Sequence, residues 1–145
     1  MNVETLIAER EIYRALVEFA YAMDHRAWDT LENVVRADAT VDFGFGLLHG
    51  RDAMIAAMRS FLDACGPTQH LLGNVVIDVD GNNAKSRVYV SDMHKGVGEK
   101  SEKTFSTLGE YHDEWRRIDN RWYMTHRTKL NRATIGDISV LGPGM

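Results

Sequence analysis

The apolar residues of this 145-residue chain change their spacing at Pro67, and this change constrains the fold more than any other feature. Before Pro67 they recur every three or four residues, which is the period of an amphipathic helix. After Pro67 they alternate, which is the period of a strand with one buried face. An order of helices followed by strands is typical of an α+β domain with helices on one face of a sheet.

The individual segments follow from the same periodicity and from turn residues. Helices are predicted over residues 4–24, 28–35 and 51–64, a short strand over 39–43, and longer strands over 68–79, 84–95, 104–118 and 121–131. The strand over 104–118 is long, so we expect a bend or bulge near Gly109. The four longer strands then form an antiparallel meander.

Composition limits the class of protein. A hydrophobic fraction of 44% over this length is enough for one domain with a buried core, so we expect a single domain over residues 1–145. With 21 acidic and 17 basic residues there is no basic stripe for nucleic acid, and no run of residues is apolar enough for a membrane span. The single cysteine, Cys65, forms no internal disulfide, and together with an acidic N-terminus it favours a cytoplasmic protein.

Two residues far apart in the sequence are the main candidates for chemistry. Asp24 ends the first predicted helix, and His70 opens the first strand of the meander. A carboxylate is unfavourable at a helix C-terminus, so another interaction should hold Asp24. If the fold joins the pair, Asp24 fixes the imidazole tautomer and supports its charge after it takes a proton. Two alternatives stay open: Asp24 caps the helix that begins near Trp28, and His70 is a hydrogen-bonded core histidine.

These features together resemble a known superfamily. The order of elements, Asp24, the Gln69-His70 strand opening, the hairpin of residues 111–122 and His126-Arg127 are similar to the nuclear transport factor 2-like superfamily. Within it the chain resembles the polyketide-cyclase (SnoaL)-like branch, which includes scytalone dehydratase, hexachlorocyclohexane dehydrochlorinase and bile-acid 7-alpha-dehydratase. The resemblance covers residues 4–137. It implies a cone-shaped α+β barrel, in which a strongly curved antiparallel sheet wraps the long N-terminal helix around an apolar cavity.

The resemblance also implies roles for particular residues. It makes Asp24 and His70 a base dyad, places Arg127 in the cavity and makes Tyr111 an aromatic lining residue. Phe19 stands where the dehydrochlorinase has a lysine and the bile-acid enzyme a tyrosine. This departure argues against dehydrochlorination, although Tyr21 lies one helical turn before the aspartate and is a partial substitute.

Strand parity adds candidates on the third-last strand. Asp92 and His94 share one face because side chains alternate. A three-residue hairpin loop places Asp92 opposite His70, whereas a four-residue loop places Met93 there. The dehydratase relatives carry a second polar group near this position, so His94 is a candidate proton donor to a leaving group. The alternative is an exposed histidine beside the Gly96 loop.

The same parity divides the last strand. One face must bury Trp122 and Met124, which assigns Arg127 to the opposite face, and the resemblance makes that face the cavity. The residues that share the face with Arg127 are Tyr123, Thr125, Lys129 and Asn131. In the cavity Arg127 would stabilise an oxyanion or leaving group. A surface ion pair is the alternative.

The function that these residues favour is a cofactor-independent lyase of a small, apolar, aromatic or cyclic compound, with loss of water as the favoured reaction. The expected catalytic residues are Asp24, His70, Arg127 and His94, and the expected substrate contacts are Phe19, Tyr21, Phe43, Asp92, Tyr111 and Asn131. No metal site is expected, because the histidines show no ligand spacing. Alternatives are an isomerase or cyclase, a formaldehyde-releasing lyase of lignin-derived dimers, and a non-enzymatic binding or assembly module. A homotrimer or homodimer is expected.

Overall fold

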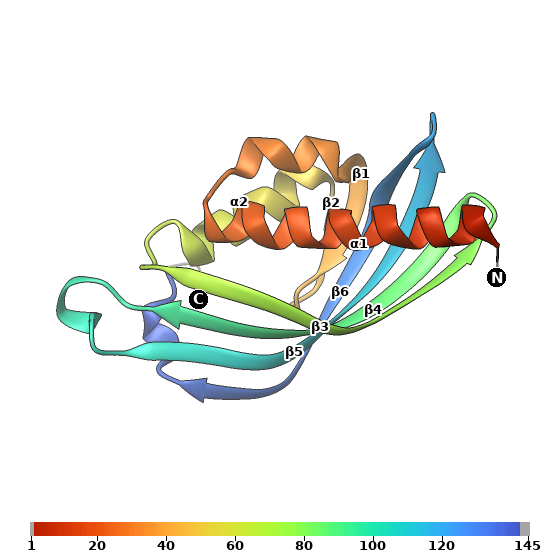
Figure 1. The fold of residues 1–145 in the computed structure, drawn as a ribbon. Helices are drawn as coiled ribbons and strands as arrows, with labels where there is room; N and C mark the ends of the chain where they lie inside the picture. The colour runs from red at the N-terminus through yellow and green to blue at the C-terminus, as the bar shows by residue number, and fades with distance from the viewer. Residues whose placement is uncertain (1, 143–145) are drawn as a thin grey trace.

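The first helix lies along the concave side of a curved sheet (Figure 1). The structure is a computed structural model and describes residues 2–142. Helix α1, Val3–Asp24, begins at Asn2, whose side chain accepts a hydrogen bond from the amide of Thr5. One face of α1 is buried against the sheet, including Ile12, Leu16 and Phe19. The periodicity of the sequence therefore predicted both the helix and its buried face.

The remaining elements follow the predicted order. They are η1 (Trp28–Asn33), β1 (Val35–Asp42), β2 (Leu47–His49), α2 (Arg51–Leu62), β3 (Thr68–Asp80), β4 (Asn83–Lys95), η2 (Gly98–Lys100), β5 (Thr104–Ile118), β6 (Arg121–Gly136) and η3 (Ile138–Val140). Strand β2 was missed, because the glycines around it were interpreted as a break. Strand β6 continues past the predicted end at residue 131.

The six strands form one unclosed sheet in the order β2-β1-β6-β5-β4-β3. The meander from β3 to β6 is antiparallel as expected, but β1 pairs with β6 in parallel, so the sheet is not wholly antiparallel. Helix α1 packs against β3, the edge strand of the sheet. Covering an edge in this way hides unpaired backbone groups from other chains.

Bulges in the long strands decide which side chains face the core. On β6, Thr125 and Arg132 are extra residues, since Met124 pairs with Trp115 but His126 with Glu114, and Asn131 pairs with Gly109 but Ala133 with Leu108. The irregularity expected near Gly109 is thus present, with its extra residue on β6. On β3 a further residue is inserted between Gly73 and Val76, where Asn74 has a φ of 51°.

The convex face of the sheet carries several exposed apolar side chains. Leu71, Tyr89, Met93 and Leu108 are all between 46% and 63% exposed. The homotrimer or homodimer expected from the sequence stays a prediction. Among residues 2–142, no helix has the length and apolar character that crossing a membrane requires.

Candidate active site

A cavity of about 510 Å³ opens between the concave face of the sheet, the ends of α1 and α2, and the C-terminal segment. This volume suits a small organic molecule. Its apolar lining comprises Met23, Phe43, Phe45, Met58, Phe61, Leu62, Phe105, Leu130, Ile138 and Leu141. Its polar lining comprises His70, His94, Thr107, Tyr111, Lys129, Asn131 and Thr134. A larger groove, of about 940 Å³, lies on charged residues elsewhere on the sheet and contains none of the histidines.

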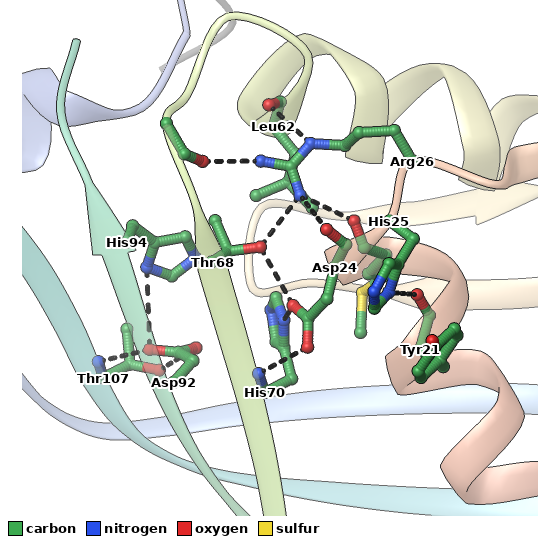
Figure 2. Close-up of polar contacts among 12 residues, drawn as sticks. Tyr21, Asp24, His25, Arg26, Leu62, Thr68, His70, Asp92, His94 and Thr107 are labelled. Carbon is green, nitrogen blue, oxygen red and sulfur yellow. Dashed lines mark hydrogen bonds and ion pairs between the residues drawn. The ribbon is translucent and has the colours of Figure 1, made fainter.

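Asp24 and His70 meet at the wall of this cavity (Figure 2). Nδ1 of His70 lies 2.6 Å from Oδ1 of Asp24, and the main-chain amide of His70 donates to Oδ2 at 2.9 Å. The hydroxyl of Thr68 donates to Oδ1 at 2.9 Å. Because an ionised carboxylate only accepts hydrogen bonds, Nδ1 carries the proton and Nε2 of neutral His70 keeps a lone pair.

The surroundings of Asp24 keep it ionised. Burial alone would raise the pKa of Asp24, but the hydrogen bonds from His70 and Thr68 outweigh it, so the pKa is lowered. These donors also compensate for the unfavourable position of a carboxylate at a helix C-terminus. The helix η1 has Ala27 at its N-cap position, so Asp24 does not cap it.

Arg26, which was not among the predicted site residues, holds the elements around the dyad together. Its backbone has a φ of 53°, and the amides of Arg26 and Ala27 bond to the carbonyls of Met23 and Ala22, which is the Schellman ending of a helix. Its guanidinium donates to the carbonyls of Leu62 and Gly66, as well as to Met23 and the carbonyl of Asp24. Arg26 therefore ties the ends of α1 and α2 to the start of β3.

The same guanidinium orients Thr68. Nη1 of Arg26 donates to Oγ1 of Thr68 at 2.8 Å, which leaves the hydroxyl hydrogen of Thr68 for Asp24. A chain of donors therefore runs from Arg26 through Thr68 to the carboxylate of Asp24 (Figure 2). A basic residue two positions after Asp24 was the only sequence signal for this arrangement.

His94 stands beside His70 on the neighbouring strand. The two rings are edge to face, with centroids 5.5 Å apart. Nδ1 of His94 lies 2.8 Å from the carbonyl oxygen of Phe105, so this nitrogen carries the hydrogen. Burial lowers the pKa of His94, although Asp92 and the Phe105 carbonyl oppose the shift. A neutral His94 is a poor proton donor, which argues against the role expected for it.

Comparison with known proteins agrees with this fold. A family model described as "SnoaL-like domain" matches residues 4–128. The chain belongs to the SnoaL-like family. An uncharacterized protein of Mycobacterium tuberculosis, Rv2910c, is 30% identical over 131 residues, which is 89% of this chain and 88% of that protein.

Two solved structures of related proteins have the same fold. One, from Novosphingobium aromaticivorans, is provisionally named a scytalone dehydratase, with a TM-score of 0.82, 23% identity and coverage of 94% of this chain and 92% of that one. The other is a hexachlorocyclohexane dehydrochlorinase of Novosphingobium barchaimii, with a TM-score of 0.83, 14% identity and coverage of 94% of both chains. The structural relatives of this SnoaL-like chain thus include proteins named as dehydratases and dehydrochlorinases, as the sequence resemblance implied.

Three of the six expected substrate contacts of this SnoaL-like chain line the cavity, and three, Phe19, Tyr21 and Asp92, do not. Phe43, Tyr111 and Asn131 are among the lining residues. Phe19 is fully buried outside the cavity, with its ring 4.2 Å from Cζ of Arg127. Tyr21 is 62% exposed and stacks on His25 on the side of α1 away from β4 (Figure 2). Tyr21 therefore does not replace the polar group missing at Phe19.

The placement expected for Arg127 was wrong. The extra residue Thr125 reverses the alternation of β6, so Arg127 lies on the same face as Trp122 and Met124. Its guanidinium donates two hydrogen bonds to Asp113, at 2.8 and 2.9 Å, and does not line the cavity. Burial would lower the pKa of Arg127, but the Asp113 carboxylate outweighs it and raises the pKa, so this is a buried ion pair.

Asp92 lies opposite His70. The sequence had left open whether Asp92 or Met93 takes this place. The hairpin loop has only two residues, and the extra residue near Asn74 supplies the remaining shift. The Asp92 carboxylate lies behind the cavity wall, where it accepts hydrogen bonds from the amide and hydroxyl of Thr107 and from Lys129.

Three side chains near the cavity could in principle hold a metal ion. Ligand atoms of His70, Asp92 and His94 lie within 4.8 Å of one another. Because Asp92 would have to release Lys129 to bind a cation, the trio does not fit a resident metal.

Proposed function

We propose that this SnoaL-like protein is a cofactor-independent lyase that removes water from a small, apolar, cyclic or aromatic substrate. The observation that carries the proposal is the 2.6 Å contact between Asp24 and His70 at the wall of an apolar cavity. A neutral histidine whose other nitrogen is held by a carboxylate is suited to act as a general base.

The reaction begins at Nε2 of His70. This nitrogen takes a proton from a carbon made acidic by a neighbouring carbonyl or phenol, and the electron pair of the C–H bond moves toward that oxygen. Asp24 stabilises the imidazolium that forms, because its negative charge lies beside Nδ1. General-base assistance of this kind contributes about 100- to 10,000-fold to the rate.

The second half of the reaction expels the leaving hydroxyl. The electron pair returns from oxygen to carbon, the adjacent C–O bond breaks, and His70 returns its proton to the departing hydroxide as water. His94 is neutral and holds its Nδ1 hydrogen against Phe105, so His70 is the better proton donor. One base thus serves both proton transfers, and no cofactor enters the balance.

The test is a screen of cyclic β-hydroxy ketones and hydroxylated phenolic compounds for loss of water, detected by mass spectrometry. The wild type should convert a member of the set, whereas His70→Ala and Asp24→Ala should be inactive with unchanged circular dichroism. Glu18→Gln, on the exposed side of α1, is the control. Turnover near the wild-type rate in either dyad variant would remove the proposal.

An isomerase or cyclase would use the same proton abstraction. If a compound incorporates deuterium from D2O without losing water, the protein is an isomerase or cyclase. If compounds of the set bind but none loses water or incorporates deuterium, the protein is a binding module.

A further inference from the structure

One of the described residues that line the cavity is a lysine, Lys129, and the chemistry described above does not use it. Its side chain is 14% exposed, and Nζ lies 3.0 Å from Oδ2 of Asp92. A charged group on the wall of a largely apolar cavity is costly unless it is paired or has a task. Pairing with Asp92 accounts for one of its three N–H donors.

The backbone is arranged so that Lys129 reaches Asp92. Lys129 of β6 pairs with Tyr111 of β5, whereas Asp92 of β4 pairs with Thr107, four residues before Tyr111 on β5. Between them lies Gly109, where an added Cβ would be 3.3 Å from Cε of Lys129. The missing side chain at Gly109 lets Lys129 lie flat over β5, along the concave wall.

Asp92 is itself firmly held. The amide of Thr107 donates to it at 2.6 Å and the hydroxyl of Thr107 at 2.7 Å. Burial raises its pKa, but Lys129 and Thr107 outweigh this effect, so the pKa of Asp92 is lowered. The ionised carboxylate fixes the ammonium group in place and cancels most of its charge in the ground state. Such a pair suits the oxygen of a neutral carbonyl or phenol that becomes negatively charged in the cavity.

We propose that Lys129 binds the substrate oxygen conjugated to the acidic carbon, and that the natural substrate is therefore a ketone or a phenol. The inference rests on the proposed function in taking His70 as the base. When Nε2 of His70 takes the proton, the C–H electron pair forms a C=C bond and the carbonyl π pair moves to oxygen. Lys129 donates a hydrogen bond to that oxygen and keeps its own proton.

The experiment uses 4-nitrophenol as a probe, because phenol and phenolate absorb at different wavelengths. The pH at which the bound probe ionises is measured for the wild type, Lys129→Met, Lys129→Arg and His70→Ala. The titratable groups around Lys129 are Asp92, to which it donates, and Tyr111, His70 and His94, which line the same cavity. Lys85→Met, on the outer face of β4, is the control for the change in net charge.

We expect the wild type to favour bound phenolate over bound phenol, and Lys129→Met to lose this preference by about 10- to 100-fold. Lys129→Arg should retain much of it, and Lys85→Met all of it. The double variant Lys129→Met with Asp92→Asn removes the unpaired carboxylate and should behave as Lys129→Met does, which excludes a folding defect as the cause.

The outcomes separate this proposal from the proposed function. A probe that ionises equally in wild type and Lys129→Met, or that fails to bind the wild type at millimolar concentration, overturns the role of Lys129. A preference lost in His70→Ala but kept in Lys129→Met does so as well. If the preference depends on Lys129 while no compound loses water, the anion site stands and the lyase proposal fails.

Discussion

One carboxylate, that of Asp24, holds both the ring and the backbone of His70. Oδ1 accepts the Nδ1 hydrogen at 2.6 Å and Oδ2 accepts the main-chain amide at 2.9 Å. The carboxylate therefore fixes where β3 begins as well as the direction of the imidazole. Loss of the charge at Asp24 affects the site through orientation and through the stability of the imidazolium at once.

Arg26 is expected to stabilise the fold and the dyad together. Arg26→Met should lower the free energy of unfolding by about 2 kcal/mol or more, because several charged hydrogen bonds are lost. Arg26→Gly is the matched variant: it loses the same bonds but relieves the left-handed backbone at a φ of 53°. Urea denaturation should place Arg26→Gly above Arg26→Met in stability. The reverse order would contradict this account.

The Arg127–Asp113 pair is expected to contribute to stability and not to the chemistry. Arg127→Met strands a buried carboxylate and should cost about 3 to 5 kcal/mol. Adding Asp113→Leu should recover most of this loss, because an apolar pair can replace a buried ion pair. Both values come from urea denaturation. A stable Arg127→Met protein that binds 4-nitrophenol but cannot turn over substrate would show that Arg127 acts in the cavity after all.

The sequence predicted the elements well because their periodicity is local, and it failed where a single inserted residue changed the alternation. Strand β5 was predicted with its observed bounds, Thr104–Ile118. Arg127 was assigned to the wrong face because nothing in the sequence marks Thr125 as an extra residue. The parallel pairing of β1 with β6 depends on contacts between distant segments, which no local pattern reports.

Local patterns were also insufficient to predict the contacts of the candidate site. Asp24 and His70 were singled out by their places at a helix end and a strand start. Only the family resemblance implied that they meet, because spacing alone cannot show that two distant residues do. Lys129 was placed on the same face as Asn131, a predicted substrate contact, and that shared face was the signal for its position in the cavity wall. Arg26 was missed because its bonds go mainly to carbonyl groups.

His94 should make stability depend on pH. Its pKa is lowered in the folded protein from the ordinary value of 6.5, so between these two values the unfolded chain binds a proton that the folded chain does not. The free energy of unfolding should therefore fall as the pH drops below about 6.5. The carboxylates Asp24 and Asp92, whose pKa values are lowered, add a further loss only in the acid range below their ordinary 3.8.

Urea denaturation as a function of pH measures this dependence. His94→Gln should flatten the curve between pH 6.5 and the onset of the acid range. An unchanged slope in that variant would assign the effect to another group.

Gly109 should be required for the position of Lys129. In Gly109→Ala the new Cβ would lie 3.0 Å from Val90 and 3.3 Å from Cε of Lys129, so the lysine must move. The variant should lose part of the preference for bound 4-nitrophenolate. Gly73→Ala, where a Cβ meets nothing within 4 Å, is the matched control. Equal behaviour of the two variants would separate Gly109 from Lys129.

The protonation of His70 tests the Asp24–His70 dyad most directly, and ¹⁵N NMR of histidine-labelled protein at mildly alkaline pH measures it. We expect a neutral ring with the hydrogen on Nδ1 and a free lone pair on Nε2, and a weaker preference for this form in Asp24→Asn. A ring with the hydrogen on Nε2, or one unaffected by Asp24→Asn, would contradict the claim that Asp24 prepares His70 as the base of this cavity.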